Sequence, residues 1–183
     1  MQMCQTFAPS MSKTGRIVNL SSVGSLTKQY SEAMARRFRD PKATLDDLAR
    51  IADEYEVTPR PYPIPLELLI DTPQRSVNSH NEEAAGFGPP PRSYSVSKSL
   101  MNAFTAILAR DNPGLTINCC CPGWIATSMG RLVGSTKVQP PKTPEEGARI
   151  PMRLAFEELG GVTGKYWANG SVRSRDAGDV QEW

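Results

Sequence analysis

Tyr94 and Lys98 stand four residues apart at the start of a segment with a helical pattern. Positions i and i+4 lie on one face of a helix, so the phenol and the ammonium should be neighbours. A positive charge favours the phenolate form of a tyrosine, which suits a tyrosine that exchanges a proton near neutral pH. Taken alone, the two residues are equally an exposed helix pair that contributes about 0.2–0.5 kcal/mol.

Two further groups of residues follow predicted strands. Ser22 comes directly after the apolar run at 16–20, and it precedes Tyr94 by 72 positions. Pro122 and Gly123 end a second apolar run at 115–120. By itself a serine at a strand end is more often a turn residue than a catalyst, and Pro-Gly is an ordinary turn.

The hydrophobic pattern predicts the elements that position these residues. Apolar runs predict three strands, at 16–20, 115–120 and 164–169. Helical spacing predicts five helices, at 2–11, 31–39, 44–55, 94–110 and 143–159. The last begins with Thr143, Pro144 and Glu146, which form a capping box with proline at the first helical position. Strands that alternate with helices favour a parallel α/β sheet.

The segment at 94–110 should show two faces. An apolar face is expected to pack on the sheet, and it consists of Val96, Leu100, Phe104 and Ile107. A second stripe is expected on roughly the opposite side, and it consists of Tyr94, Lys98, Met101 and Thr105.

Residues 26–93 form the least regular third of the chain. Five prolines between 58 and 73 exclude a continuous helix or a central strand there. Further prolines follow at 89–91. We expect a long helical and proline-rich insertion.

Composition excludes several classes of function. The 183 residues suffice for one domain with a core, and the net charge of +2 gives no electrostatic case for nucleic acid or an anionic membrane. No apolar run reaches the length of a membrane span. The four cysteines, three of them consecutive, are expected to be reduced in a reducing compartment, the cytoplasm. We expect no metal site, and we assign no function to His80, the single histidine.

Four motifs in order resemble the C-terminal half of short-chain dehydrogenases/reductases, most closely the carbonyl reductase branch. They are residues 15–22 (GRIVNLSS), 94–98 (YSVSK), 118–127 (NCCCPGWIAT) and 143–148 (TPEEGA). The resemblance implies a partial Rossmann-type, three-layer α/β/α fold with a short parallel sheet and with the N-terminal strands missing. It implies one truncated domain over 1–183, interrupted by the insertion at about 26–93.

The resemblance also implies roles for individual residues. Ser22, Tyr94 and Lys98 would be catalytic, with Tyr94 protonating the carbonyl oxygen as hydride arrives at its carbon. The cofactor NADP would contact Tyr94, Lys98, Pro122, Gly123, Ile125 and Thr127. Ser22 would also bind the small carbonyl substrate. Trp124 is either a wall of the substrate pocket or a packing residue, and we favour the pocket wall.

The chain lacks several features of the family's first half, and the glycine-rich turn is the most informative of them. The family holds the cofactor pyrophosphate on a glycine-rich turn after its first strand, and no such motif occurs here. The glycines at 86 and 88 run into prolines, and those at 160 and 161 precede a strand. Because the family's first four strands are also missing, we expect an exposed edge at strand 16–20. Because the pyrophosphate site is missing, we expect weak cofactor binding.

Two hypotheses follow. The first is NADP-dependent reduction of carbonyl compounds by hydride transfer. The alternative is a truncated, catalytically inactive remnant that acts as an interaction module. In carbonyl reductases the insertion covers the helix face that other members use to dimerise, so the resemblance implies a weaker tendency to dimerise, which favours a monomer.

Overall fold

The computed structural model of this protein describes residues 2–57, 82–89, 92–133 and 138–183. The prolines between 58 and 73 and His80 lie outside the described residues, so the predicted proline-rich segment stays a prediction. The described helices and strands follow the predicted α/β order, with additions near the C-terminus.

A four-stranded sheet forms the centre of the molecule, with the order β1-β2-β3-β4. The strands β1 (Arg16–Leu20), β2 (Thr116–Cys120) and β3 (Tyr166–Ala168) are parallel to one another. The strand β4 (Asp179–Gln181) is antiparallel to β3. In the described part of the chain β1 lies at the edge of the sheet, as predicted.

The strand β4 was not predicted from the sequence. All three of its residues are exposed, so the strand lacks the alternation of apolar and polar residues that identifies a half-buried strand. Its backbone pairing with β3 arises from tertiary contact alone.

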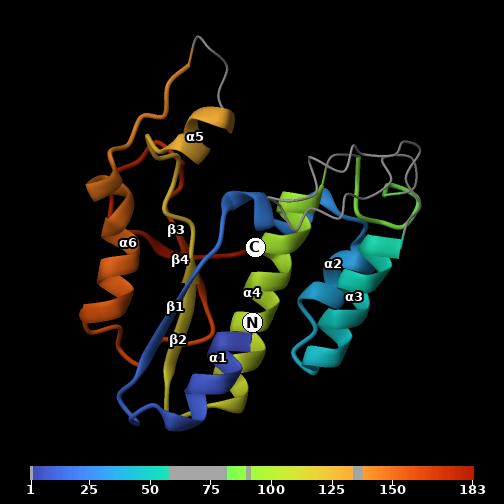
Figure 1. Ribbon diagram of the computed structural model, residues 1–183, viewed down its shortest axis with the longest axis horizontal. Helices are drawn as coiled ribbons and strands as arrows, with labels where there is room; N and C mark the ends of the chain where they lie inside the picture. Colours follow the sequence, from blue (N-terminus) through green and yellow to red (C-terminus); the bar gives the residue numbers. More distant parts are fainter. Residues whose placement is uncertain (1, 58–81, 90–91, 134–137) are drawn as a thin grey trace, which may run out of the picture.

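Helices cover both faces of the sheet (Figure 1). The helix α4 (Ser93–Asp111) lies on one face and α6 (Pro144–Phe156) on the other. The helices α2 (Glu32–Phe38) and α3 (Leu45–Val57) lie on the far side of α4. The N-terminal helix α1 (Gln2–Phe7) continues into the 3-10 turn η1 (Ala8–Ser10). The predicted three-layer, partial Rossmann-type fold is therefore confirmed.

The helix α4 is buried on two sides, which corrects one prediction. The stripe that begins at Tyr94 was expected to point away from the sheet, yet Lys98 donates to the carbonyl oxygen of Leu20 at 2.9 Å, at the end of β1. Thr105 accepts a hydrogen bond from Asn19 of β1 at 2.9 Å. The apolar face of α4 belongs to one core cluster together with α2, α3 and Ile117 of β2, and the other members of that cluster include Val96, Phe104, Ile107, Phe38, Leu48 and Ile51. Periodicity shows that two faces differ, but it does not tell which one meets a sheet.

Capping residues determine where α6 begins. The capping box of α6 is present as predicted: Thr143 accepts from the Glu146 amide at 3.2 Å, and Glu146 accepts from the Thr143 amide at 2.9 Å. The helix ends at Phe156, earlier than predicted, and the glycines at 160 and 161 occupy left-handed positions in the turn beyond it.

The short helix α5 (Ser128–Val133) was not predicted. Its six residues include Gly130, which disfavours a helix by about 1 kcal/mol relative to alanine. The hydroxyl of Thr127 accepts from the Gly130 amide at 3.1 Å. A capped helical turn therefore follows residue 127.

Candidate active site

The predicted site begins where β1 ends. Ser22 has an extended backbone (φ −159°) and forms the N-cap of the 3-10 turn η2 (Val23–Ser25). Its Oγ accepts a hydrogen bond from the Gly24 amide at 3.1 Å. No hydrogen bond among the described residues uses the hydroxyl as a donor, so Ser22 can donate to an incoming oxygen.

Tyr94 lies beside this turn, in the first turn of α4. A Cβ placed on Gly24 would lie 3.3 Å from the Cε1 atom of Tyr94 and 3.5 Å from the Oγ of Ser22. The phenol ring and the hydroxyl therefore flank one point, although 72 positions separate them in the sequence. The Tyr94 side chain is about half exposed, at 51%, and its hydroxyl makes no hydrogen bond within the described part of the chain.

Lys98 lies one helical turn after Tyr94. Its Nζ is 5.7 Å from the centroid of the Tyr94 ring and donates to the Leu20 carbonyl. Burial lowers the pKa of the Lys98 ammonium, and the neighbouring Cys121 opposes that shift. An ammonium has three donors, and the Leu20 carbonyl occupies one of them.

A buried polar network, which the sequence analysis missed, attaches η2 to α4. The side chain of Asn102 donates to the Ser25 hydroxyl at 2.8 Å and accepts from the hydroxyl of Ser21. It also accepts from the Cys119 thiol at 3.3 Å. Ser99 donates to the Ser25 carbonyl at 3.0 Å. These bonds fix the position of Ser22 relative to Tyr94 through its neighbours on both sides.

One feature of the sequence hinted at this network. Ser95, Ser99 and Asn102 recur at helical spacing in a segment that is otherwise largely apolar. Buried polar groups are nearly always hydrogen-bonded, so a polar stripe on a buried helix indicates partners elsewhere in the fold.

The segment at 122–127 continues β2 across the same edge of the sheet. Gly123 has φ +89°, and a Cβ there would lie 2.7 Å from the Val172 carbonyl oxygen. The amide of Trp124 donates to that same carbonyl at 3.0 Å. Glycine at 123 therefore satisfies both a left-handed backbone conformation and a close approach of two chain segments.

The other predicted residues of this segment are held by their neighbours. The Nε1 of Trp124 donates to the Gly130 carbonyl at 2.7 Å, and the Arg173 guanidinium lies 5.7 Å from the Trp124 ring centroid. Ile125 packs on α6 at Gly147, where a Cβ would come within 2.2 Å of its Cδ1. Thr127 caps α5.

Lys142 is a second lysine at this edge, and the sequence analysis did not single it out. Its side chain is fully buried, at 1% exposure, and its Nζ donates to the Pro122 carbonyl at 2.8 Å. Its backbone pairs with the 122–127 segment, through the carbonyl of Trp124 at 3.3 Å and the amide of Ala126 at 2.8 Å. A charged residue in a polar loop sequence gives no sign of such burial.

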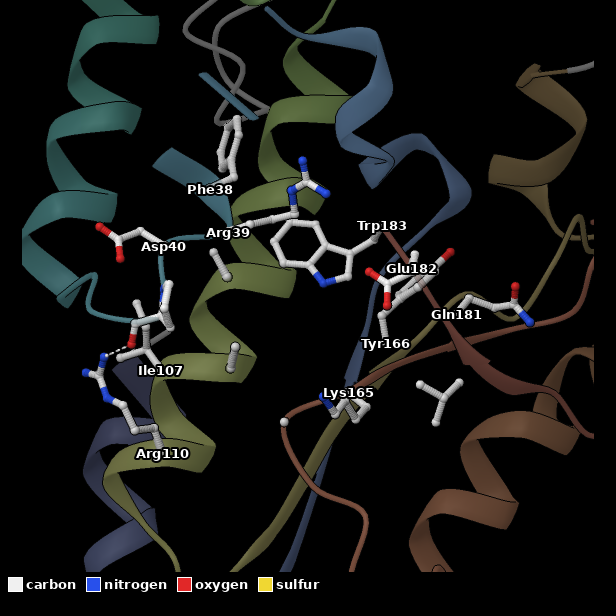
Figure 2. Close-up of a pocket in the computed structure, with 15 residues that line it drawn as sticks. Phe38, Arg39, Asp40, Ile107, Arg110, Lys165, Tyr166, Gln181, Glu182 and Trp183 are labelled. Atoms are coloured by element: carbon white, nitrogen blue, oxygen red, sulfur yellow. Dashed lines mark hydrogen bonds between the residues drawn. The ribbon is translucent and has the colours of Figure 1, made fainter. Parts of the chain in front are cut away.

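A hollow of about 400 Å³ lies elsewhere, between α4 and the C-terminal residues (Figure 2). Arg39, Arg110 and Trp183 are among its lining residues, and none of the predicted site residues lines it. We therefore assign this hollow no part in the chemistry at the strand ends.

The described residues contain no group of three or more His, Cys, Asp or Glu side chains arranged to hold a metal ion. None of the described helices has the length and apolar character needed to cross a membrane. All four cysteines are free, and three of them are buried: Cys119, Cys120 and Cys121.

The chain is similar to several characterised proteins. It is 32% identical to short-chain dehydrogenase/reductase 1 of Saponaria officinalis over 162 residues, which are 88% of this chain and 46% of that protein. It is also 32% identical to carbonyl reductase [NADPH] 3 of Rattus norvegicus over 161 residues, 84% of this chain and 49% of that protein. The chain thus spans about half the length of the curated relatives that it matches. No protein-family model matches it.

Solved structures agree with the sequence comparison. Salutaridine reductase of Papaver somniferum aligns with 90% of this chain and 49% of its own, with a TM-score of 0.65 and 26% identity. Menthone neomenthol reductase of Mentha piperita aligns with 91% of this chain and 46% of its own, with a TM-score of 0.58 and 25% identity. Sequence and fold together show that the chain belongs to the short-chain dehydrogenase/reductase superfamily, with carbonyl reductases among its relatives.

Proposed function

We propose that this chain provides the catalytic side chains of an NADP-dependent reductase of small carbonyl compounds. The observation that carries the proposal is the shared position of Ser22 and Tyr94 around Gly24, with the Lys98 ammonium one turn along the same helix. A hydrogen-bond donor, a proton donor and a cation at one edge of a parallel sheet suit carbonyl reduction. The relatives named for NADPH-dependent carbonyl reduction support the choice of cofactor and substrate class.

The residues present fit the nicotinamide end of such a cofactor. The Lys98 ammonium has donors left for ribose hydroxyls, and the left-handed backbone at Gly123 lets the chain turn without a side chain beside the ring. The sequence has no glycine-rich turn for the pyrophosphate. We therefore propose that the adenosine and phosphate end is held by a nucleotide-binding half outside these 183 residues.

Bound NADPH supplies the hydride that reaches the carbonyl carbon. The Ser22 hydroxyl donates a hydrogen bond to the carbonyl oxygen and orients it toward Tyr94. The Tyr94 hydroxyl transfers its proton to that oxygen as negative charge develops there. The nearby Lys98 charge stabilises the phenolate that remains. Because the Tyr94 side chain is half exposed, water can restore its proton for the next turnover.

The organisation of the protein follows from the same proposal. We propose one domain over residues 1–183 with an insertion at about 26–93. The helices α2 and α3 of that insertion cover the outer side of α4, which supports a monomer. Free, buried cysteines support a reducing compartment such as the cytoplasm.

The test uses the native protein, captured from its source with an antibody to this chain. Its intact mass is measured, and NADPH oxidation is followed with an aldehyde and with a quinone. We expect a mass above 20.1 kDa and a reductase activity that is lost in Tyr94→Phe but retained in the matched exposed variant Thr14→Ala. A 20.1 kDa protein that neither binds NADPH nor reduces a carbonyl would establish the inactive-remnant alternative instead.

A further inference from the structure

We propose that Lys142 is a positioning residue whose ammonium holds the Pro122–Gly123 turn in place for the nicotinamide end of the cofactor. This inference rests on the proposed function, because that function places the cofactor beside the turn. It concerns a residue that lies 15 or more positions beyond the 122–127 segment and that none of the predicted motifs contains.

The contacts of Lys142 are concentrated on the turn. Its Nζ donates to the Pro122 carbonyl at 2.8 Å. A Cβ on Gly123 would lie 3.0 Å from both the Cδ and the Nζ of Lys142. Its backbone bonds to Trp124 and Ala126 hold the same segment from the side. Lys142 therefore contacts the turn through its aliphatic carbons, its ammonium group and its main chain.

Burying the Lys142 ammonium beside the turn is energetically unfavourable. Burial of an ammonium is unfavourable unless hydrogen bonds and opposite charges compensate for the lost water. Among the described residues the Pro122 carbonyl is the hydrogen-bond acceptor of this ammonium. Burial lowers the pKa of Lys142; the titratable groups that act on that pKa are Cys121 and Glu146, which raise it, and Arg149 and Arg175, which lower it.

Lys142 has a counterpart in Lys98. The Lys98 ammonium donates to the carbonyl of Leu20, the last residue of β1, and the Lys142 ammonium donates to the carbonyl of Pro122, two residues beyond β2. Carbonyl groups at strand ends have no further partner in the sheet, so each ammonium satisfies one of them. The two lysines thus hold the ends of β1 and β2, which carry Ser22 and Gly123.

The first part of the test measures the turn itself by amide hydrogen exchange in the full chain. Lys142→Met keeps the length of the stem and removes the donor and the charge. We expect exchange at Trp124 and Ala126 to accelerate about tenfold, which is the effect of one lost charge-assisted hydrogen bond. Exchange at Ile117, in the centre of β2, should not change. Lys13→Met, at an exposed turn, is the matched control.

The second part measures cofactor use in the active native protein. Lys142→Met should raise KM for NADPH about tenfold with little change in kcat, because a misplaced turn weakens ground-state and transition-state binding alike. Unchanged exchange at Trp124 and Ala126, equal acceleration at Ile117, or an unchanged KM would each overturn the positioning role. If the unmodified protein does not bind NADPH, the proposed function fails, whereas the exchange result still decides whether Lys142 holds the turn.

Discussion

Asn102 should be the residue through which the turn that carries Ser22 is attached to α4. It is 2% exposed, and three hydrogen bonds end on its side chain, from Ser21, from Cys119 and to Ser25. The substitution Asn102→Leu preserves the approximate size of the side chain and removes all three bonds.

The expected loss of stability can be worked from these contacts. A neutral hydrogen bond contributes about 1 kcal/mol net, so three bonds give about 3 kcal/mol. The loss is partly offset, because Ser21 keeps the Lys98 carbonyl as an acceptor at 3.3 Å and leucine adds buried apolar area. We expect a net loss of about 2 kcal/mol, which lowers the folding equilibrium constant about thirtyfold.

Urea unfolding followed by tryptophan fluorescence measures this change, and a double-mutant cycle assigns it. Asn102→Leu combined with Ser25→Ala should show a coupling of about 1 kcal/mol, because the two side chains share one bond. When Asn102→Leu is combined with Thr14→Ala, a substitution at an exposed turn, the two changes in the free energy of unfolding should add. A loss below about 0.5 kcal/mol for Asn102→Leu, or additivity with Ser25→Ala, would refute the reasoning.

Three further predictions concern the site, the sheet and α6. Gly24→Ala should lower kcat of the active protein roughly tenfold, because the new Cβ displaces the Tyr94 ring. The free energy of unfolding should change by less than about 1 kcal/mol, because Gly24 does not have a positive φ. An unchanged kcat would contradict this. Burial raises the pKa of Cys119 and of Cys120 from 9.0 to about 12. Their contribution to stability is therefore complete below pH 9 and is lost as the pH rises toward 12, on the order of 1 kcal/mol per pH unit for each thiol. Urea unfolding between pH 8.5 and 10.5 measures the slope, and equal slopes in the unmodified protein and in the Cys119→Ala, Cys120→Ala double variant would refute the assignment. Thr143→Ala removes the N-cap of α6 and should cost about 1 kcal/mol, which lowers Tm by about 2–4 °C; an unchanged Tm in calorimetry would show that the cap is dispensable.

Strong local patterns in the sequence are enough to predict most of the helices and strands. Helical spacing and the capping box predicted α2, α3, α4 and the start of α6, and apolar runs predicted β1, β2 and β3. The spacing of Tyr94 and Lys98 also fixed their common side of α4, because a helix places i and i+4 together whatever surrounds it. The ordered motifs identified the superfamily.

Other features required contacts between distant parts of the chain. The strand β4 forms because β3 offers its edge, and its own exposed residues give no pattern. The direction of the Tyr94 stripe depended on where β1 lay, since both faces of α4 are covered. Short elements such as α5 have local propensities too weak to outweigh their glycine.

The candidate site also combines features that the sequence predicts with features that depend on tertiary contacts. Ser22 and Tyr94 could be nominated from the sequence, but only the parallel pairing of β1 with β2 under α4 brings them to one point. Asn102 and Lys142 carry polar groups that ordinarily face solvent, so their residue types alone give no sign of burial. The tertiary structure buries both because each satisfies backbone or side-chain groups that the fold itself places in the interior.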